Sequence, residues 1–160
     1  MDRKGLIYYY RLNLHIIKSQ TNGLTHADSI LQLPFRGNCM NWVLGHLINS
    51  RDIVFSFLDV PTILNEKEKQ LYQYGSTPIT SASQEAMTLD SLMESLGRSQ
   101  EVLEEAINSL KDEEFDRKVN WDERELSLFQ FIQFFHWHEA YHTGQLELLR
   151  QLAGKNDSII

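Results

Sequence analysis

The chain has 160 residues, a formal net charge of −7, 42% hydrophobic residues and 23% charged residues. This length suits one domain with one core, and the balanced composition is typical of a globular protein rather than a disordered one. The acidic charge argues against nucleic acid and anionic membranes as partners, since both favour a basic surface. No apolar run reaches the length of a membrane span. The single cysteine, Cys39, excludes an intrachain disulfide and fits a cytoplasmic location.

The hydrophobic spacing predicts four long helices, at residues 3–20, 38–59, 83–110 and 127–153. Asn38 is the expected N-cap of the second helix, and Ser83 begins the third. Ser127 begins the fourth, with Gln130 at the spacing of a capping box.

The three connections, at residues 21–37, 60–82 and 111–126, are long. The middle one has room for a short helix around residues 65–74 and can span a bundle as an overhand crossover. We therefore predict an all-α fold, a four-helix bundle with a long crossover between its second and third helices. Residues 1–160 are expected to form a single domain, since no repeat or linker divides the chain.

Two histidines of the fourth predicted helix share its apolar face. At about 100° per residue, His142 lies roughly 40° from His138, on the side that carries Phe135 and Leu149. His136 falls about 160° away, so we expect it on the outside of the helix. The pair is therefore predicted to project inward.

The same geometry on the second helix places His46 on a largely apolar face. Three imidazoles in one core are costly unless each finds a partner, and a metal ion bound by His46, His138 and His142 would satisfy all three. Three protein ligands leave coordination positions open for water or substrate, as in catalytic rather than structural sites. Zinc, nickel, iron and manganese all remain candidates.

Residues 138–142 also fit the pattern H-E-x-x-H, in which the glutamate of a zinc metalloprotease is the general base. Such an enzyme needs a third ligand and a substrate-cleft strand, and no histidine follows His142. Glu139 lies on the flank of the helix, where it can pair with a neighbouring helix instead. A degenerate protease is therefore the weakest alternative.

Gln145 lies one turn beyond His142 and has two interpretations. It orients a ligand or a bound water, or it is an amide bonded within the core. Cys39 is expected to be a buried small residue too far from His46 to share its metal, and His15 and His26 receive no role. The aromatic residues around residues 129–137 cover more than one helix face, which favours a homodimer.

Two sequence segments resemble a known family. They are Asn41-Trp42-Val43-Leu44-Gly45-His46-Leu47 with the following Ser50-Arg51-Asp52, and His138-Glu139-Ala140-Tyr141-His142-Thr143-Gly144-Gln145-Leu146. Together they are similar to the DinB/YfiT-like superfamily of metal-dependent enzymes, and the similarity extends over most of the chain.

The resemblance implies an up-down-down-up four-helix bundle, often a homodimer, with a divalent metal on His46, His138 and His142. Characterised relatives include transferases and isomerases that use a low-molecular-weight thiol, bacillithiol or mycothiol, and members regarded as hydrolases. We therefore expect a thiol-dependent S-transferase that acts on a small-molecule substrate. A metal-dependent hydrolase and a non-catalytic, metal-stabilised bundle are the alternatives. The residues themselves identify no general base.

Overall fold

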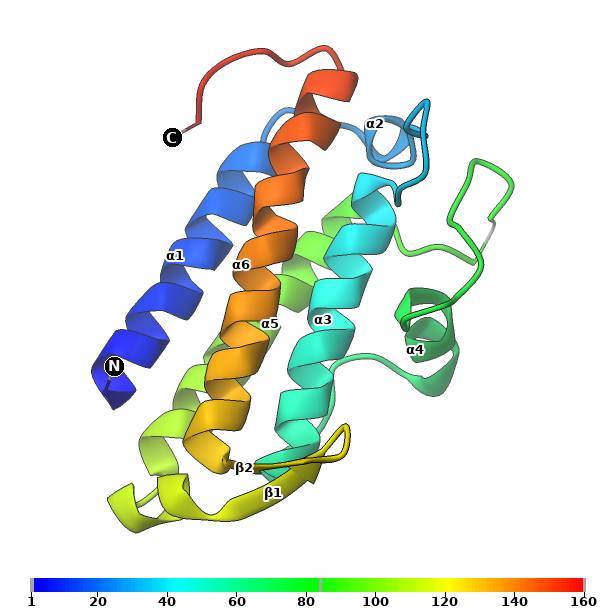
Figure 1. Cartoon of the computed structure of the whole chain (residues 1–160). Helices are drawn as coiled ribbons and strands as arrows, with labels where there is room; N and C mark the ends of the chain where they lie inside the picture. Colours follow the sequence, from blue (N-terminus) through cyan, green and yellow to red (C-terminus); the bar gives the residue numbers. More distant parts are fainter. Residues whose placement is uncertain (1, 84, 160) are drawn as a thin grey trace.

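The computed structural model describes residues 2–83 and 85–159, and long helices make up most of it (Figure 1). The long helices are α1 (Arg3–Thr21), α3 (Met40–Phe57), α5 (Leu89–Ser109) and α6 (Leu128–Leu152). The connections contain α2 (His26–Ser29), α4 (Glu66–Tyr72), the 3-10 helix η1 (Asp112–Asp116), β1 (Lys118–Trp121) and β2 (Arg124–Ser127). The predicted helical fold class is confirmed. Within the described residues, no helix is both long and apolar enough to cross a bilayer.

Side-chain caps define where several helices begin. Ser127 and Gln130 form the predicted capping box at the start of α6. Asn65 caps α4 inside the predicted segment 65–74. Asp2 caps α1 in the same way, with its carboxylate accepting a backbone hydrogen bond of the first turn.

Two predicted helix starts lie too early. The hydroxyl of Thr88 caps α5, which therefore begins at Leu89, whereas the Ser83 hydroxyl accepts a hydrogen bond from the Thr80 amide within a turn. Residue 84 of the predicted helix lies outside the described residues. α3 has Cys39 rather than Asn38 at its cap position, and no side chain caps it.

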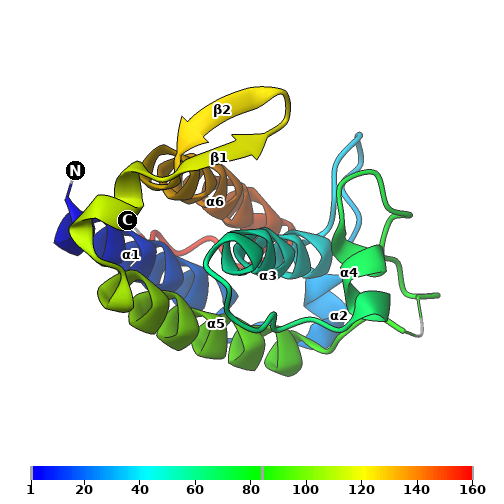
Figure 2. The same ribbon diagram turned by 90° about the horizontal axis from the view of Figure 1, so that it is seen from below.

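The long helices run in two opposite directions. The colours of Figure 1 show α1 and α6 rising together while α3 and α5 descend. Side-chain contacts agree, because Arg11 pairs with Glu104 and Arg3 donates to the Leu110 carbonyl, which makes α1 and α5 antiparallel. Each long helix packs on two of the others, and the end view of Figure 2 shows them around a common centre.

Two groups of buried apolar side chains fill this centre. The group near the start of α3 includes Ile17, Leu44, Leu47, Leu96 and Leu146. The group near the end of α3 includes Leu6, Phe55, Leu103, Phe131 and Phe135. Between them, α3, α5 and α6 contribute the buried polar residues Arg51, Ser99 and Glu139. The core is therefore interrupted by a polar layer halfway along the helices.

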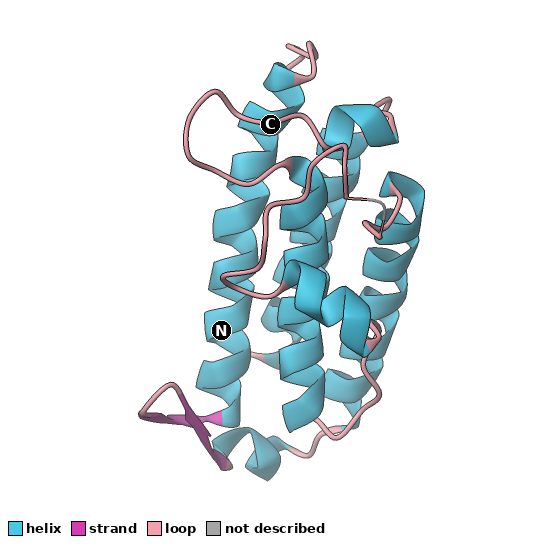
Figure 3. Ribbon diagram, turned by 90° about the vertical axis from the view of Figure 1, so that its right-hand side faces the viewer, coloured by secondary structure: helices cyan, strands magenta, loops and turns pink. Residues whose placement is uncertain are grey.

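The crossover from α3 to α5 occupies residues 58–88 and includes α4, which packs on α3. Figure 3 shows it passing along the outside of the long helices. The carboxylate of Asp52 fixes its start by accepting hydrogen bonds from the amides of Ile63 and Leu64, at 2.7 and 2.9 Å. Burial raises the pKa of Asp52, and these two hydrogen bonds oppose that effect.

The connection before α6 is more regular than predicted. It contains η1 and an antiparallel hairpin in which Trp121 pairs with Arg124. The two turn residues, Asp122 and Glu123, both have positive φ, of 50° and 62°. A two-residue turn of this kind favours Asn-Gly or Gly-Gly, so Asp-Glu gave no signal for a hairpin.

The prediction that His136 lies on the outside of its helix is wrong. Its ring is half-buried and packs on Tyr9 and Tyr10 of α1, at centroid distances of 5.8 and 5.2 Å. Helix α6 packs on α1 and on α3, so two of its faces are covered. A helix with two buried faces has no single outside opposite its inward histidines.

Candidate metal centre

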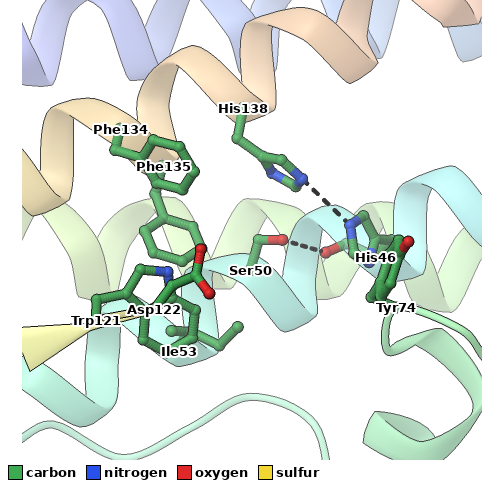
Figure 4. Close-up of a pocket in the computed structure, with 9 residues that line it drawn as sticks. All are labelled: His46, Ser50, Ile53, Tyr74, Trp121, Asp122, Phe134, Phe135 and His138. Atoms are coloured by element: carbon green, nitrogen blue, oxygen red, sulfur yellow. Dashed lines mark hydrogen bonds between the residues drawn. The ribbon is translucent and has the colours of Figure 1, made fainter. Parts of the chain in front are cut away.

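The three predicted ligands lie together where α3 faces the middle of α6. His46 comes from α3, and His138 and His142 come from successive turns of α6. One ring nitrogen from each lies within 4.8 Å of the other two, and the Nε2 atoms of His46 and His138 are 3.3 Å apart. Figure 4 shows these last two rings pointing at each other. Among the described residues, no other group of three potential metal ligands comes this close.

The ring of His46 is positioned by a hydrogen bond at one nitrogen and by a stacking contact on one face. Its Nδ1 donates to the carbonyl of Tyr72 at 2.9 Å, and because a carbonyl only accepts, Nε2 is left with a free lone pair. Trp42 stacks on the ring at a centroid distance of 4.5 Å and an interplanar angle of 13°. Gly45 permits the approach of Tyr72, since a Cβ on Gly45 would lie 2.2 Å from the tyrosine ring. Tyr72 therefore fixes the tautomer of His46, and Trp42 and Gly45, its neighbours in the sequence, help to fix the orientation of the ring.

His142 contacts Gln145, the residue for which the sequence suggested a role in orienting a ligand or a bound water. Its Nδ1 lies 2.9 Å from Oε1 of Gln145, which can only accept, so the proton is on Nδ1 and Nε2 is free. Gln145 is exposed, which favours the orienting interpretation of this residue over an amide bonded within the core. A hydrogen bond of this kind, on the far nitrogen of a histidine, is what metal-binding histidines in proteins usually have.

Burial keeps the three imidazoles neutral. Desolvation lowers the pKa of His46 to about 4, with the hydrogen bond to Tyr72 opposing it and His142 adding to it. Desolvation, with the charges of its two partners, lowers the pKa of His138 to about 4 as well. The pKa of His142 is lowered by desolvation, against the opposing effect of Gln145. Neutral imidazole is the form that binds a metal ion.

The residues present fit a divalent metal. Two nitrogens, each about 2.0–2.1 Å from one ion at a tetrahedral angle, lie about 3.3–3.4 Å apart. The observed separation of the His46 and His138 Nε2 atoms matches that value. The Nδ1 of His138 is buried and has no hydrogen-bond partner among the described residues, so the only ring nitrogen of His138 with a partner there is the Nε2 that faces His46.

Glu139 does not belong to this centre. Its two carboxylate oxygens accept hydrogen bonds from Nε and Nη2 of Arg51, both at 2.8 Å, and both residues are almost completely buried. Arg51 also donates to the Ser99 hydroxyl and to the Leu96 carbonyl of α5. The predicted pairing of Glu139 with a neighbouring helix is therefore confirmed. A carboxylate bound in this way is not free to act as a general base, which removes the basis for a metalloprotease.

Two cavities meet at the histidines. One, of about 650 Å³, reaches from His46 and His138 to the hairpin and is lined mainly by apolar side chains such as Ile53, Trp121 and Phe134. The other, of about 580 Å³, touches all three histidines and has a more polar lining than the first. Its lining includes Arg36, Asn38, Trp42, Tyr74, Ser76 and Tyr141. Both volumes lie in the range of small-molecule sites.

The remaining candidates stand apart from the centre. Cys39 is the buried residue that we expected, its thiol contacts the Ile79 carbonyl, and burial raises its pKa, which makes the thiol unreactive. His15 is exposed on α1, and His26 begins the short helix α2.

Several residues of the site gave no signal in the sequence. Tyr72 acts through its backbone carbonyl, so the identity of its side chain cannot reveal the contact. Trp121 reaches the cavity on the hairpin that the sequence did not predict.

The comparisons with known proteins identify the family and agree with the fold. The model of the DinB superfamily matches residues 30–146, so the chain belongs to the DinB superfamily, and the matched range contains all three histidines. A solved structure, a conserved protein from Enterococcus faecalis, has 14% sequence identity to this chain and a TM-score of 0.73. The match covers 95% of this chain and 97% of that one, and at this identity it shows a common fold alone. No curated protein is significantly similar to the chain.

Proposed function

We propose that this protein is a metal-dependent enzyme that transfers the sulfur of a small thiol to an electrophilic substrate. One observation carries the metal-dependent part. His46 and His142 each form a hydrogen bond through Nδ1, and one ring nitrogen of each lies within 4.8 Å of one ring nitrogen of His138. A three-histidine metal site has neutral imidazoles that face one another, with hydrogen bonds on their outer nitrogens, and two of these three histidines have such a bond.

His46, His138 and His142 would hold the ion. When bound, a divalent metal lowers the pKa of a coordinated thiol or water and stabilises negative charge. Tyr72 and Gln145 hold the first and last of these rings, and Trp42 covers one face of His46. The protein therefore contributes a fixed three-nitrogen face whose remaining side opens into the cavities.

The two cavities support a reaction with two organic reactants. A transferase must place a thiol and an electrophile at one point, whereas a hydrolase needs space for one substrate and a water. The sulfur would form a bond to the electrophilic carbon, the leaving group would depart with the bonding electron pair, and the thiol proton would pass to solvent. Cys39 is buried and contacts the Ile79 carbonyl, so the reacting thiol would come from a small molecule.

The proposal includes the architecture and the partners. We infer that the four long helices form one DinB-like domain, an up-down-down-up bundle with residues 58–88 as the crossover, located in the cytoplasm. Dimerisation is supported by exposed apolar residues on α6 and α1, namely Trp137 (61% exposed), Leu148 (48%) and Tyr8 (61%). A dimer mass in sedimentation, reduced to a monomer mass by Trp137→Glu, is the expected result. A monomer at micromolar concentration contradicts this part alone.

A screen of thiols against electrophiles tests the proposed reaction. Protein loaded with zinc, nickel, iron or manganese is incubated with bacillithiol, glutathione or coenzyme A and a panel of activated halides and epoxides. We expect thioether formation that requires both thiol and metal and is lost in His138→Ala. Substrate loss that requires metal but no thiol would identify the hydrolase instead. Absence of turnover, together with a large fall in melting temperature on chelation, would identify a metal-stabilised bundle.

A further inference from the structure

The cavity between the histidines and the hairpin is built mainly from apolar side chains. Its inner end is formed by His46 and His138, and its walls are formed by Ile53 of α3, Trp121 of the hairpin, and Phe134 and Phe135 of α6. Figure 4 shows these side chains around one space, with Trp121, Phe134 and Phe135 at the end away from His46 and Tyr74 beside His46. A group held in this space would lie directly beside the proposed metal.

The aromatic wall is firmly positioned. The Trp121 ring makes edge-to-face contacts with Phe131 and Phe135 of α6, at centroid distances of 5.7 and 5.6 Å, and with Phe57 of α3, at 6.2 Å. These contacts tie the hairpin to both helices that carry the histidines. Trp121 is therefore a rigid wall of the cavity and not a mobile loop residue.

The turn next to Trp121 adopts a backbone conformation that is unfavourable for one of its two residues. Asp122 and Glu123 are both in the left-handed region, which aspartate tolerates but which a glutamate rarely adopts. The turn places Asp122 at the cavity, where its carboxylate is paired with Arg124 at 3.0 Å. Arg124 in turn lies over the Phe134 ring, 5.7 Å from its centroid. Such strain persists where the surrounding contacts enforce it, and it is concentrated at functional sites.

The charges around this cavity select against an anion. Among the described residues that line it there is no lysine or arginine, and the one acidic group, Asp122, already has a cationic partner. The Ser50 hydroxyl donates to the His46 carbonyl at 2.8 Å. Arg36 lines the other cavity. The two cavities therefore differ in chemistry, and the hairpin cavity suits an uncharged apolar group.

We propose that the hairpin cavity binds an aromatic or similarly bulky apolar group of the substrate, with Trp121 as the residue that determines this specificity. The proposal rests on the metal centre of the proposed function and names the substrate class for it. The electrophile carries the apolar group, and the polar thiol enters from the Arg36 side.

Two metal-binding probes of different size test this proposal without any turnover. Acetohydroxamate and benzohydroxamate share the same chelating group, and only the second carries an aryl ring. Protein loaded with Co²⁺ is titrated with each, and the visible absorption of the ion reports binding. We expect benzohydroxamate to bind about 10- to 100-fold more tightly, since burial of a ring contributes this much.

Variants identify where the ring binds. Trp121→Ser is expected to reduce the preference for benzohydroxamate to less than about threefold, with the affinity for acetohydroxamate unchanged. Ile53→Phe fills the same cavity from α3 and leaves the hairpin intact, so it is expected to have the same effect. Leu12→Ser is the control, because Leu12 is exposed on α1 and does not line the cavity, and the preference should persist.

The possible failures are distinguishable. Equal affinities of the two probes for the wild-type protein overturn the cavity assignment and leave the metal centre intact. A preference that persists in both Trp121→Ser and Ile53→Phe also overturns it, because the ring then binds elsewhere, for example on the Arg36 side. Failure of the protein to take up Co²⁺ contradicts the proposed function itself.

Discussion

Two polar contacts join α3 to α6 within a short distance along the helices. They differ in how completely their polar atoms are paired and in whether they border a cavity. Arg51 and Glu139 form a closed contact, in which both carboxylate oxygens are paired and Arg51 is also bonded to α5. His46 and His138 form an open one, in which nitrogens face each other beside two cavities. The closed contact links α3, α5 and α6, whereas the open contact leaves room for a metal ion and a ligand beside it.

This difference shows that neighbouring residues of one motif can have different roles, one at a candidate binding site and the other in the buried core. His138 and Glu139 are adjacent on α6 and point about 100° apart, so one reaches the cavities and the other reaches the buried layer. The pattern H-E-x-x-H alone therefore does not define a protease. The partner of the glutamate decides its role, and here that partner is Arg51.

The largest effect is expected from opening the closed contact. Glu139→Ala leaves the buried guanidinium of Arg51 without its counter-charge, and we expect the free energy of unfolding to fall by about 3–5 kcal/mol. Urea denaturation in the presence of a chelator measures it. Glu147→Ala, at an exposed position of the same helix, should change stability by less than about 0.5 kcal/mol. Equal stabilities of these two variants would show that the contact does not support the fold.

A smaller effect is expected from removing the hydrogen bond between Gln145 and His142 beside the open contact. Gln145→Ala deletes the acceptor that orients His142, and we expect metal affinity to fall about 10- to 100-fold with little loss of stability. Competition with a chelating dye measures the affinity. Gln151→Ala is the control, since Gln151 is an exposed glutamine further along α6. If both variants bind metal as the wild type does, Gln145 has no part in the centre.

The stability of the metal-free protein should depend on pH, because His46 and His138 are buried in their neutral form. Folding lowers the pKa of His46 and His138 to about 4, against about 6.5 in the unfolded chain. The unfolded state then binds more protons, so stability is highest above pH 6.5 and falls toward pH 4. We expect each histidine to contribute on the order of 1 kcal/mol of this loss by pH 5.

Urea denaturation of chelated protein between pH 7 and pH 5 tests this linkage. His46→Gln should lose less stability over this interval than the wild type, because glutamine does not titrate. A pH profile identical to that of the wild type would show that folding does not suppress protonation of His46.

The sequence predicted the parts of the site that depend on a single helix. His138, His142 and Gln145 share a face because helical geometry places them there, and His46 follows from the same argument on α3. The capping box at Ser127 and the pairing of Glu139 with another helix could also be predicted from the sequence.

The remaining features depend on contacts between elements, so the pattern of a single helix could not predict them. His136 packs on α1 because α6 has two covered faces, which one helical projection cannot show. The hairpin wall with Trp121 is anchored by phenylalanines of two helices, and its turn residues lack the usual glycine. Tyr72 orients His46 through a backbone atom, which any residue would offer.

Metal titration of untagged protein tests the central claim most directly. We predict that the wild type binds one divalent ion per chain and that His138→Ala binds it at least about 100-fold more weakly. His136→Ala should bind as the wild type does, because His136 faces α1 and not the centre. A wild-type protein that takes up no metal, or a His138→Ala variant that binds it unchanged, would contradict the account.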